Sequence, residues 1–209
     1  MMRGKFITFE GGEGSGKSTQ VRLLCDFLKT QGIDAVQTRE VGGSPSAEAI
    51  RKLWLEPKEG YWDSLTELLL IMAARREHLA KTVFPALDRG AWVVSDRFAD
   101  STRAYQGIGL GLGLDVVEDF YNRIAPGFEP DLTLLLDLPV EEGLSRMKKR
   151  AGQDDRYQQK DVVFHQKLRD AYLSLAKKYA TRFHIIGASG DEASVATAVQ
   201  SAVRKHFKI

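Results

Sequence analysis

The chain has 209 residues, of which 43% are hydrophobic and 28% are charged, and its formal net charge is +2 at pH 7. These proportions are typical of a globular domain with a substantial core, and the small net charge gives no reason to expect binding to nucleic acid or to a membrane surface. A single cysteine, Cys25, excludes an intrachain disulfide, and we expect neither a signal peptide nor a membrane-spanning segment, which makes the cytoplasm the expected location.

The first predicted elements are a strand and a helix on either side of a glycine-rich loop. An apolar run from Phe6 to Phe9 predicts the strand, and apolar residues at helical spacing from Val21 to Leu28 predict the helix. The intervening residues 11–18 read Gly-Gly-Glu-Gly-Ser-Gly-Lys-Ser and match the pattern G-x-x-x-x-G-K-[ST] between a strand and a helix. In that context the pattern predicts a site for a nucleoside triphosphate.

Each residue type in this loop suits the binding of phosphate. Glycines let the backbone turn until several N–H groups point at one anion, and the helix that follows adds the positive end of its dipole. Lys17 would reach the β- and γ-phosphates, and the hydroxyl of Ser18 would bind Mg²⁺. The predicted ATP-binding residues are Gly11, Gly12, Glu13, Gly14, Ser15, Gly16, Lys17, Ser18 and Thr19.

Strands and helices alternate along the rest of the chain. Further strands are predicted at 33–36, 92–95, 132–137 and 183–186, and helices at 47–55, from 64 to about 90, and at 115–125, 140–150, 161–179 and 191–207. Ser46 is the expected N-cap of the second helix, and the glycine-rich segment 107–113 is an expected mobile loop. This order predicts an α/β P-loop NTPase fold, one domain over 1–209, with a five-stranded parallel sheet and helices on both faces.

Polar residues gather where three of these strands end. The phosphate loop follows the first strand, Thr38-Arg39-Glu40 follows the second, and Asp96-Arg97 follows the third. Ligands of open parallel sheets bind at the carboxyl ends of the strands, so we expect these residues to line one cleft. There Asp96 could hold Mg²⁺ opposite Ser18; it could also cap the next helix, and one carboxylate can do both.

Arginines and one glutamate raise more specific expectations. Arg39, Arg51 and Arg97 together suit an anion other than the phosphates of ATP, although each by itself could be an exposed surface residue. The carboxylate of Glu13 would repel phosphate inside the loop, so its side chain should turn toward a hydroxyl or a metal, unless it is simply solvated. The basic segment from Arg146 to Arg156 is either a solvated helix face or a lid that closes over the transferred phosphate.

The residues above resemble the thymidylate kinase family, and the resemblance extends from about Lys5 to Phe207. The phosphate loop with an internal acid, residues 9–20, is similar to that of the family. Three further segments resemble the family's T-R-E-P-G-G-T, G-E-x-I-R and A-x-R motifs; they are 38–44, 47–51 and 73–75. The most specific match is 96–107, which follows the family signature D-R-Y-x-x-S-x-x-A-Y-Q-G.

The resemblance implies a nucleoside monophosphate kinase fold and transfer of the γ-phosphate of ATP to dTMP in the synthesis of dTTP. It also implies Mg²⁺ as the metal and a homodimer formed through the long helix after residue 64. The implied catalytic residues are Lys17, Arg97, Arg150 and Arg156, with Ser18 and Asp96 at the metal. The implied dTMP-binding residues are Glu13, Arg39, Arg51, Ile71, Arg75, Arg97, Ser101, Tyr105 and Gln106.

Within this implied dTMP site, each residue has a role that follows from the resemblance. Three arginines, at 39, 51 and 97, would hold the phosphate of dTMP. Arg75 would bond to the edge of thymine, with Ser101 and Gln106 nearby. Tyr105 would leave no room for a ribose 2′-hydroxyl, and Glu13 would face the 3′-hydroxyl.

Two positions depart from the family pattern, and a third distinguishes the two branches of the family. Val41 replaces a proline, so the turn that places Arg39 is expected to be less rigid. Ile71 stands where the family usually has a phenylalanine that stacks on thymine. One branch of the family has a catalytic arginine at the position of Gly14; the other, bacterial branch takes this arginine from a lid, here at about 146–158, which implicates Arg150 and Arg156.

Two alternatives stay open. A kinase for another nucleoside monophosphate, or for an unphosphorylated deoxynucleoside, would share the phosphate loop, although the second would not need Arg39 and Arg51. A GTPase-like switch is disfavoured, because guanine recognition there usually requires an N-K-x-D segment. The only asparagine of the chain, Asn122, is followed by Arg123.

Overall fold

The computed structural model describes residues 3–56, 61–148, 157 and 160–209. Five parallel strands form one sheet in the order β2–β3–β1–β4–β5. They are β1 (Phe6–Glu10), β2 (Ala35–Arg39), β3 (Trp92–Asp96), β4 (Leu132–Asp137) and β5 (Phe183–Gly187). Strands β2 and β3 lie on one side of β1 and strands β4 and β5 on the other, so the direction of strand addition reverses beside β1. Ligands of such sheets bind at this point of reversal.

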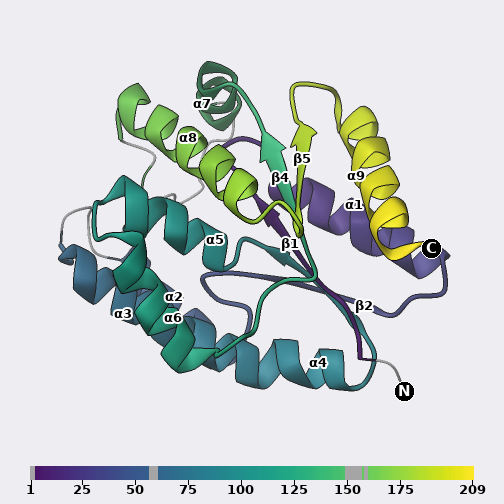
Figure 1. The fold of residues 1–209 in the computed structure, drawn as a ribbon, viewed down its shortest axis with the longest axis horizontal. Coiled ribbons are helices and arrows are strands. Elements are labelled where there is room, and N and C mark those ends of the chain that lie inside the picture. Colours follow the sequence, from purple (N-terminus) through teal and green to yellow (C-terminus); the bar gives the residue numbers. More distant parts are fainter. Residues whose placement is uncertain (1–2, 57–60, 149–156, 158–159) are drawn as a thin grey trace.

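Helices cover both faces of the sheet (Figure 1). Helices α1 (Lys17–Thr30) and α9 (Glu192–Phe207) pack on one face, against Ile7 and Phe9 of β1. On the other face Phe6 packs against α3 (Ser64–His78), α4 (Phe84–Asp88) and α6 (Leu114–Ile124). Successive strand residues point to opposite faces, which is why β1, buried throughout, contributes to both cores.

The remaining helices surround the carboxyl ends of the strands or extend the elements above. The π-helical turn η1 (Leu79–Val83) joins α3 to α4, and α5 (Ala99–Thr102) continues into a second π-helical turn, η2 (Arg103–Gly109). The others are α2 (Pro45–Leu55), α7 (Val140–Lys148) and α8 (Val162–Lys178). None of the helices in the described ranges is long and apolar enough to cross a membrane.

The predicted fold class is confirmed, with two local corrections near the second strand. β2 runs from Ala35 to Arg39, later than the predicted 33–36, because its partner β3 begins at Trp92, opposite Ala35, and ends at Asp96, opposite Arg39. The predicted N-cap Ser46 was wrong: the hydroxyl of Ser44 accepts from the N–H of Ala47 at 3.3 Å, and Pro45 takes the first helical position. A proline suits that position because its missing N–H would have no partner there.

The segment 107–113 also differs from the expected mobile loop. Its first residues are helical, because η2 continues to Gly109, and Gly107 is buried. The N–H groups of Leu110 and Leu112 then donate to the carbonyls of Tyr105 and Gln106 at 2.7 Å and 3.2 Å. Glycine content suggested flexibility, but Gly107 serves close packing: a Cβ there would lie 3.1 Å from the Leu114 side chain.

Candidate active site

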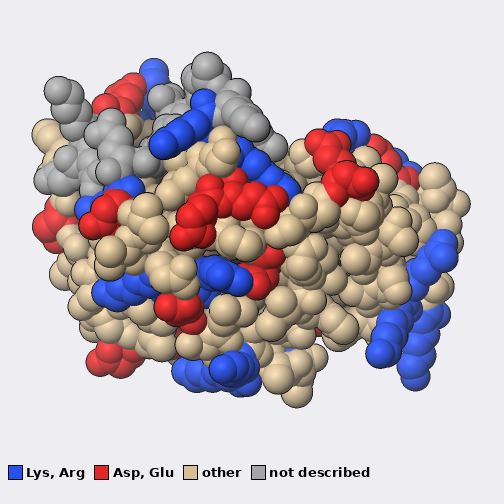
Figure 2. Space-filling model, turned by 90° about the horizontal axis from the view of Figure 1, so that it is seen from above, with Lys and Arg blue, Asp and Glu red and all other residues tan. Residues whose placement is uncertain are grey.

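A cavity of about 490 Å³ opens at the carboxyl ends of β1, β2 and β3. Every residue predicted to bind the phosphate acceptor lines this cavity, and so do Ser18 and Asp96. Acidic and basic side chains lie close together on this face of the molecule (Figure 2). The fold therefore brings together side chains that the sequence places on six different segments.

The phosphate loop encloses the side chain of Lys17, which begins α1 and is buried. Its Nζ donates to the carbonyl oxygens of Gly11 at 3.0 Å and Gly12 at 2.8 Å, and to the hydroxyl of Ser15 at 3.2 Å. Burial lowers the pKa of Lys17, because water no longer stabilises the ammonium charge. Phosphate oxygens would be stronger partners for this cation than the carbonyls it now contacts.

Gly14 lies against α7, and this contact determines whether the loop has room for a side chain at position 14. Its φ is 71°, and a Cβ placed on it would lie 2.2 Å from the carbonyl oxygen of Gly143. Both the backbone conformation and the close approach exclude a side chain at this position. An arginine could not be accommodated here without moving α7.

Ser18 and Asp96 form the candidate metal site. The Ser18 hydroxyl, in the first turn of α1, donates to Oδ2 of Asp96 at 2.5 Å, at the end of β3. The alternative role of Asp96 as a helix cap is not observed, because α5 begins after Phe98 and has no side-chain cap. No group of three or more His, Cys, Asp or Glu side chains suited to a metal occurs in the described ranges. Two protein oxygens suit Mg²⁺ that takes its other ligands from water and substrate phosphates.

The side chain of Glu13 turns toward Arg97 and Tyr105. Its Oε1 accepts from Nη2 of Arg97 and from the hydroxyl of Tyr105, each at 2.5 Å. Arg97 also donates to the carbonyl of Gly11 at 3.3 Å, and its guanidinium lies 5.2 Å from the centre of the Tyr105 ring. Glu13 was expected to turn toward a hydroxyl or a metal, and it meets the hydroxyl of Tyr105; its implied contact with the 3′-hydroxyl of dTMP stays a prediction.

Glu10, the last residue of β1, holds the segment that follows β3. Its carboxylate accepts from the N–H of Phe98 at 2.8 Å, the hydroxyl of Ser101 at 2.6 Å and the hydroxyl of Tyr172 at 3.2 Å. Burial, reinforced by the charge of Asp100, raises the pKa of Glu10 to about 7. Sequence reasoning missed this residue; an acid at the end of an otherwise apolar strand was the available signal.

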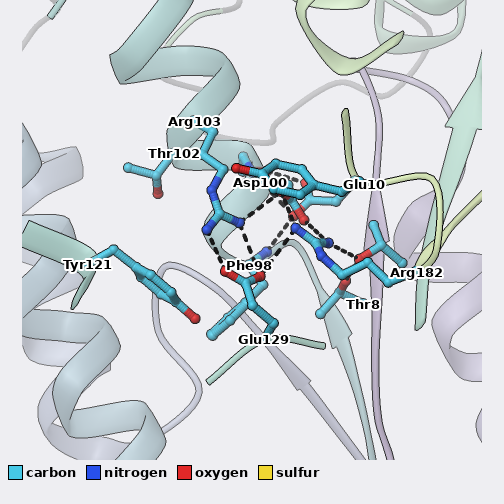
Figure 3. A network of polar contacts seen from close by, with 12 residues as sticks. Thr8, Glu10, Phe98, Asp100, Thr102, Arg103, Tyr121, Glu129 and Arg182 are labelled. Carbon is cyan, nitrogen blue, oxygen red and sulfur yellow. Dashed lines mark hydrogen bonds and ion pairs between the residues drawn. The ribbon is translucent and has the colours of Figure 1, made fainter. Parts of the chain in front are cut away.

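A second buried network fixes the start of η2 (Figure 3). Asp100 lies between two arginines: Arg103 donates to it at 2.9 Å and Arg182, which precedes β5, at 2.6 Å. Both arginines also pair with Glu129, at 2.6 Å and 3.2 Å. Breaking such a buried ion pair strongly destabilises a protein. This network therefore anchors η2, which contains Tyr105.

The raised pKa of Glu10 predicts a pH dependence of stability. The folded protein binds the proton more tightly than the unfolded chain, whose Glu has a pKa of about 4.5. Protonation therefore favours folding, and this contribution is complete below pH 4.5 and disappears as the pH rises to about 7. The unfolding free energy of wild type and of a Glu10→Gln variant is measured by urea titration at pH 4.5 and at pH 8. Between these pH values the unfolding free energy of the wild type should fall by on the order of 2–3 kcal/mol more than that of the variant.

The same substitution at Glu141, an exposed residue of α7, is the control. The Glu141→Gln variant should follow the wild-type dependence on pH. Parallel curves for wild type and Glu10→Gln would show that Glu10 does not carry the buried proton.

Known proteins resemble this chain in sequence and in fold. Residues 9–199 match the family model described as thymidylate kinase. The chain is 50% identical over 204 residues to a thymidylate kinase of Ruegeria pomeroyi, covering 98% of this chain and 96% of the relative. It is 46% identical over 203 residues to one of Caulobacter vibrioides, with 97% of each chain covered.

A crystal structure of thymidylate kinase from Ehrlichia chaffeensis superposes with a TM-score of 0.78 at 32% identity, over 96% of this chain and 99% of that one. The chain belongs to the thymidylate kinase family.

Arg75, one of the residues expected to hold the substrate of a thymidylate kinase, is fixed by buried contacts. It is 2% exposed; its Nε donates to Glu40 at 2.7 Å and its Nη2 to the hydroxyl of Thr102 at 2.8 Å. Its guanidinium lies 5.0 Å from the ring centre of Phe98. Glu40 and Thr102 were not predicted as site residues, yet they fix the direction in which Arg75 points into the cavity.

The other side chains that are predicted to bind the substrate in this thymidylate kinase family member differ in their burial and in their partners. Arg39 is largely exposed and pairs with Glu48 at 3.0 Å, while Nη1 of Arg51 donates to the carbonyl of Val41 at 2.7 Å. Ser101 lines the cavity, but its hydroxyl is directed to Glu10 rather than left for a base. Ile71, Tyr105 and Gln106 are buried on the cavity wall. The predicted Arg150 and Arg156, and most of the predicted lid at 146–158, lie outside the described residues.

Proposed function

We propose that this chain transfers the γ-phosphate of ATP to dTMP, giving ADP and dTDP, a step in the synthesis of dTTP. One observation carries the proposal: a phosphate loop and a second set of arginines, Arg39, Arg51 and Arg97, border one cavity. A triphosphate on the loop and a monophosphate on the arginines would meet there. The family membership and the match over nearly the whole chain support dTMP as the acceptor.

The proposed mechanism is mainly positioning and charge neutralisation. The acceptor phosphate has a second pKa of about 6, so it is already a nucleophilic dianion at neutral pH and needs no general base. Arg97, held by Glu13 and the Gly11 carbonyl, would orient this phosphate in line with the γ-phosphate. Lys17 would exchange its loop carbonyls for the β- and γ-phosphate oxygens and neutralise their charge.

Ser18 and Asp96 would hold Mg²⁺ together with ATP, and the metal would supply charge neutralisation at the phosphates when bound. We further propose that the chain is one domain over 1–209 with a lid at about 146–158 and that it works in the cytoplasm. A lid is needed because water that reached the γ-phosphate would hydrolyse ATP.

The substrate test is a spectrophotometric assay of ADP formation with dTMP, dUMP, CMP, AMP and thymidine as acceptors. The proposal predicts the highest kcat/KM for dTMP and little or no reaction with thymidine, which lacks the phosphate that Arg39, Arg51 and Arg97 would bind. Preference for CMP or AMP would instead assign the chain to another nucleoside monophosphate, and preference for thymidine would make it a deoxynucleoside kinase.

Tyr105 should provide the discrimination against ribonucleotides. Its buried ring lies beside Arg97 and its hydroxyl is bound to Glu13, which leaves a rigid wall at the sugar. The substitution Tyr105→Ala should therefore raise kcat/KM for ribothymidine monophosphate relative to that for dTMP. The matched control is Tyr105→Phe, which keeps the ring and loses the hydroxyl that is bound to Glu13.

The ratio of the two kcat/KM values should therefore change in Tyr105→Ala and stay near wild type in Tyr105→Phe. An unchanged ratio in both variants would place the discrimination elsewhere. A change in both would assign it to the hydroxyl rather than to the ring.

We also propose a homodimer through α3. Leu65 and Leu69 lie four residues apart on this helix, hence on one face, and are 43% and 45% exposed. Leu53 of the neighbouring α2 is exposed as well. Sedimentation equilibrium should give twice the chain mass of 23.3 kDa, and Leu69→Glu should shift the protein toward the monomer. A wild type that sediments as a monomer at micromolar concentration would contradict the proposal.

A further inference from the structure

One side of the phosphate loop rests on the segment that runs from β4 into α7. A Cβ on Gly11 would lie 2.5 Å from the carbonyl oxygen of Leu136 in β4. A Cβ on Gly14 would lie 2.2 Å from the carbonyl oxygen of Gly143 in α7. Two other glycines of the loop have no atom within 4 Å of the corresponding position; they are Gly12 and Gly16. The loop is therefore supported at two of its glycines, by the backbone of one continuous segment.

The contact between the loop and α7 is reciprocal. Gly143 is buried, and a Cβ on it would lie 2.5 Å from the carbonyl oxygen of Glu13. A Cβ atom does not approach another atom this closely, and a backbone oxygen cannot rotate away as the end of a side chain can. The two backbones therefore cross at a distance that requires glycine on both sides, at Gly14 in the loop and at Gly143 in the helix.

Glycine is an unfavourable residue for the position that Gly143 occupies. It is the fourth residue of α7, where glycine lowers helix stability relative to alanine because its backbone loses more freedom. The flanking residues, Glu142 and Leu144, are good helix formers. Gly143 is not among the glycines with positive φ, so its backbone conformation does not require glycine either. The close approach to the phosphate loop is the feature of the structure that requires it.

This contact supports a part of the loop that Lys17 does not hold. A phosphate loop binds an anion only while its N–H groups converge, and ordering a flexible glycine-rich loop on binding lowers affinity. Lys17 holds the first half of the loop through the carbonyls of Gly11 and Gly12. The second half, which begins at Glu13, lies against α7. Packing of α7 on the loop therefore restricts the conformations of this second half before a nucleotide binds.

We infer that Gly143 is a positioning residue for the triphosphate of ATP, because it lets α7 lie directly against the phosphate loop and hold the loop in its anion-binding curvature. The contact is made by backbone atoms on both sides, so Gly143 acts on the loop and does not touch the phosphates. The inference rests on the proposed function, since it concerns how the loop binds the phosphate donor. It predicts that Gly143→Ala weakens the binding of ATP, even though alanine favours the helix itself.

The test is calorimetry of wild type and Gly143→Ala with three ligands: ATP with Mg²⁺, inorganic tripolyphosphate with Mg²⁺, and dTMP. The added methyl group overpacks the contact, so the loop or the helix must shift. The affinities for ATP and for tripolyphosphate should both fall by about 5- to 100-fold. Tripolyphosphate has no base or sugar, so it reports on the loop alone, and the affinity for dTMP should change less.

Ser145→Ala is the matched control, because it changes an exposed residue of the same helix to alanine and adds no contact with the loop. Its three affinities should equal those of the wild type, and thermal unfolding of each variant shows whether it is folded. A measurement on the wild type keeps the test independent of the folding of Gly143→Ala. Tripolyphosphate with Mg²⁺ should slow hydrogen exchange of the α7 amides, because a loop that is held more firmly stabilises the helix packed on it, and should leave α6 unchanged.

Several outcomes would overturn the inference. A folded Gly143→Ala that binds ATP and tripolyphosphate within about twofold of wild type would do so, and so would unchanged exchange of α7 in the wild type. Weaker binding of ATP with unchanged binding of tripolyphosphate would show that α7 acts on the nucleoside and not on the loop. A wild type that binds both ligands as expected but does not phosphorylate dTMP would contradict the proposed function and leave the role of Gly143 standing. A wild type that binds neither would contradict both.

Discussion

The kcat of a Lys17→Ala variant is expected to be at least about 10²–10³-fold lower than that of the wild type, as for the loss of one preorganised group that stabilises charge in a transition state. The structure supports this magnitude, because Nζ of Lys17 is enclosed by the loop and contacts Gly11, Gly12 and Ser15. The chain offers no second lysine in this loop to take its place.

The same substitution leaves loop carbonyls without a donor, which can destabilise the protein by about 1–3 kcal/mol. The variant must therefore be compared with wild type by thermal unfolding as well as by steady-state kinetics. Lys29→Ala, at an exposed position near the end of the same helix, is the control and should retain wild-type kcat. A folded Lys17→Ala variant with near-wild-type kcat would rule out the loop as the site of the transferred phosphate.

The second large effect is expected from the lid arginines, Arg150 and Arg156. An arginine that meets the charge of a transferring phosphoryl group contributes about 10³–10⁵ in rate in related reactions. The loop cannot supply it, because the approach of Gly143 to Gly14 excludes a side chain there. The cations that line the cavity within the described ranges are arginines, and Arg75 and Arg97 already pair with Glu40 and Glu13.

Replacing the catalytic lid arginine by alanine should lower kcat by about this factor while KM for dTMP changes little, because the contact forms mainly in the transition state. Each arginine is changed singly, and Lys148→Ala, an exposed residue of α7, is the control for the charge of the region. An Arg→Lys variant at the sensitive position keeps the charge but loses the planar fork, so it should recover only part of the rate. If both alanine variants keep kcat within a few-fold, the lid excludes water and takes no part in charge neutralisation.

The parts of this protein that sequence predicted correctly are those encoded by neighbouring residues. The phosphate loop is one contiguous stretch, 11–18, and its strand and helix adjoin it. The alternation of strands and helices fixed the parallel sheet, because parallel strands require crossover connections. The ends of β1, β2 and β3 then had to share one edge, and their polar residues do line one cavity.

Sequence reasoning failed in two places for different reasons. Ser46 has the chemistry of an N-cap, but the adjoining Pro45 takes the first helical position and leaves the cap to Ser44, which is a local effect. The glycines of 107–113 suggest flexibility, but η2 continues to Gly109 and Gly107 is buried, where a Cβ would lie 3.1 Å from the Leu114 side chain. This second error arises because burial is set by the fold and not by glycine content.

The sequence alone determined which groups are available for binding phosphate, since charge and hydrogen-bonding capacity belong to residue types. Only the tertiary structure decided where those groups point. Glu10 meets Ser101 across 91 residues of sequence, and Glu67 meets Tyr157 across 90. Such pairings depend on how α3, η2 and α8 pack on the sheet, because hydrogen bonds require a particular distance and direction that no local pattern encodes. The orientation of the Arg75 guanidinium, which Glu40 and Thr102 hold, comes entirely from such contacts.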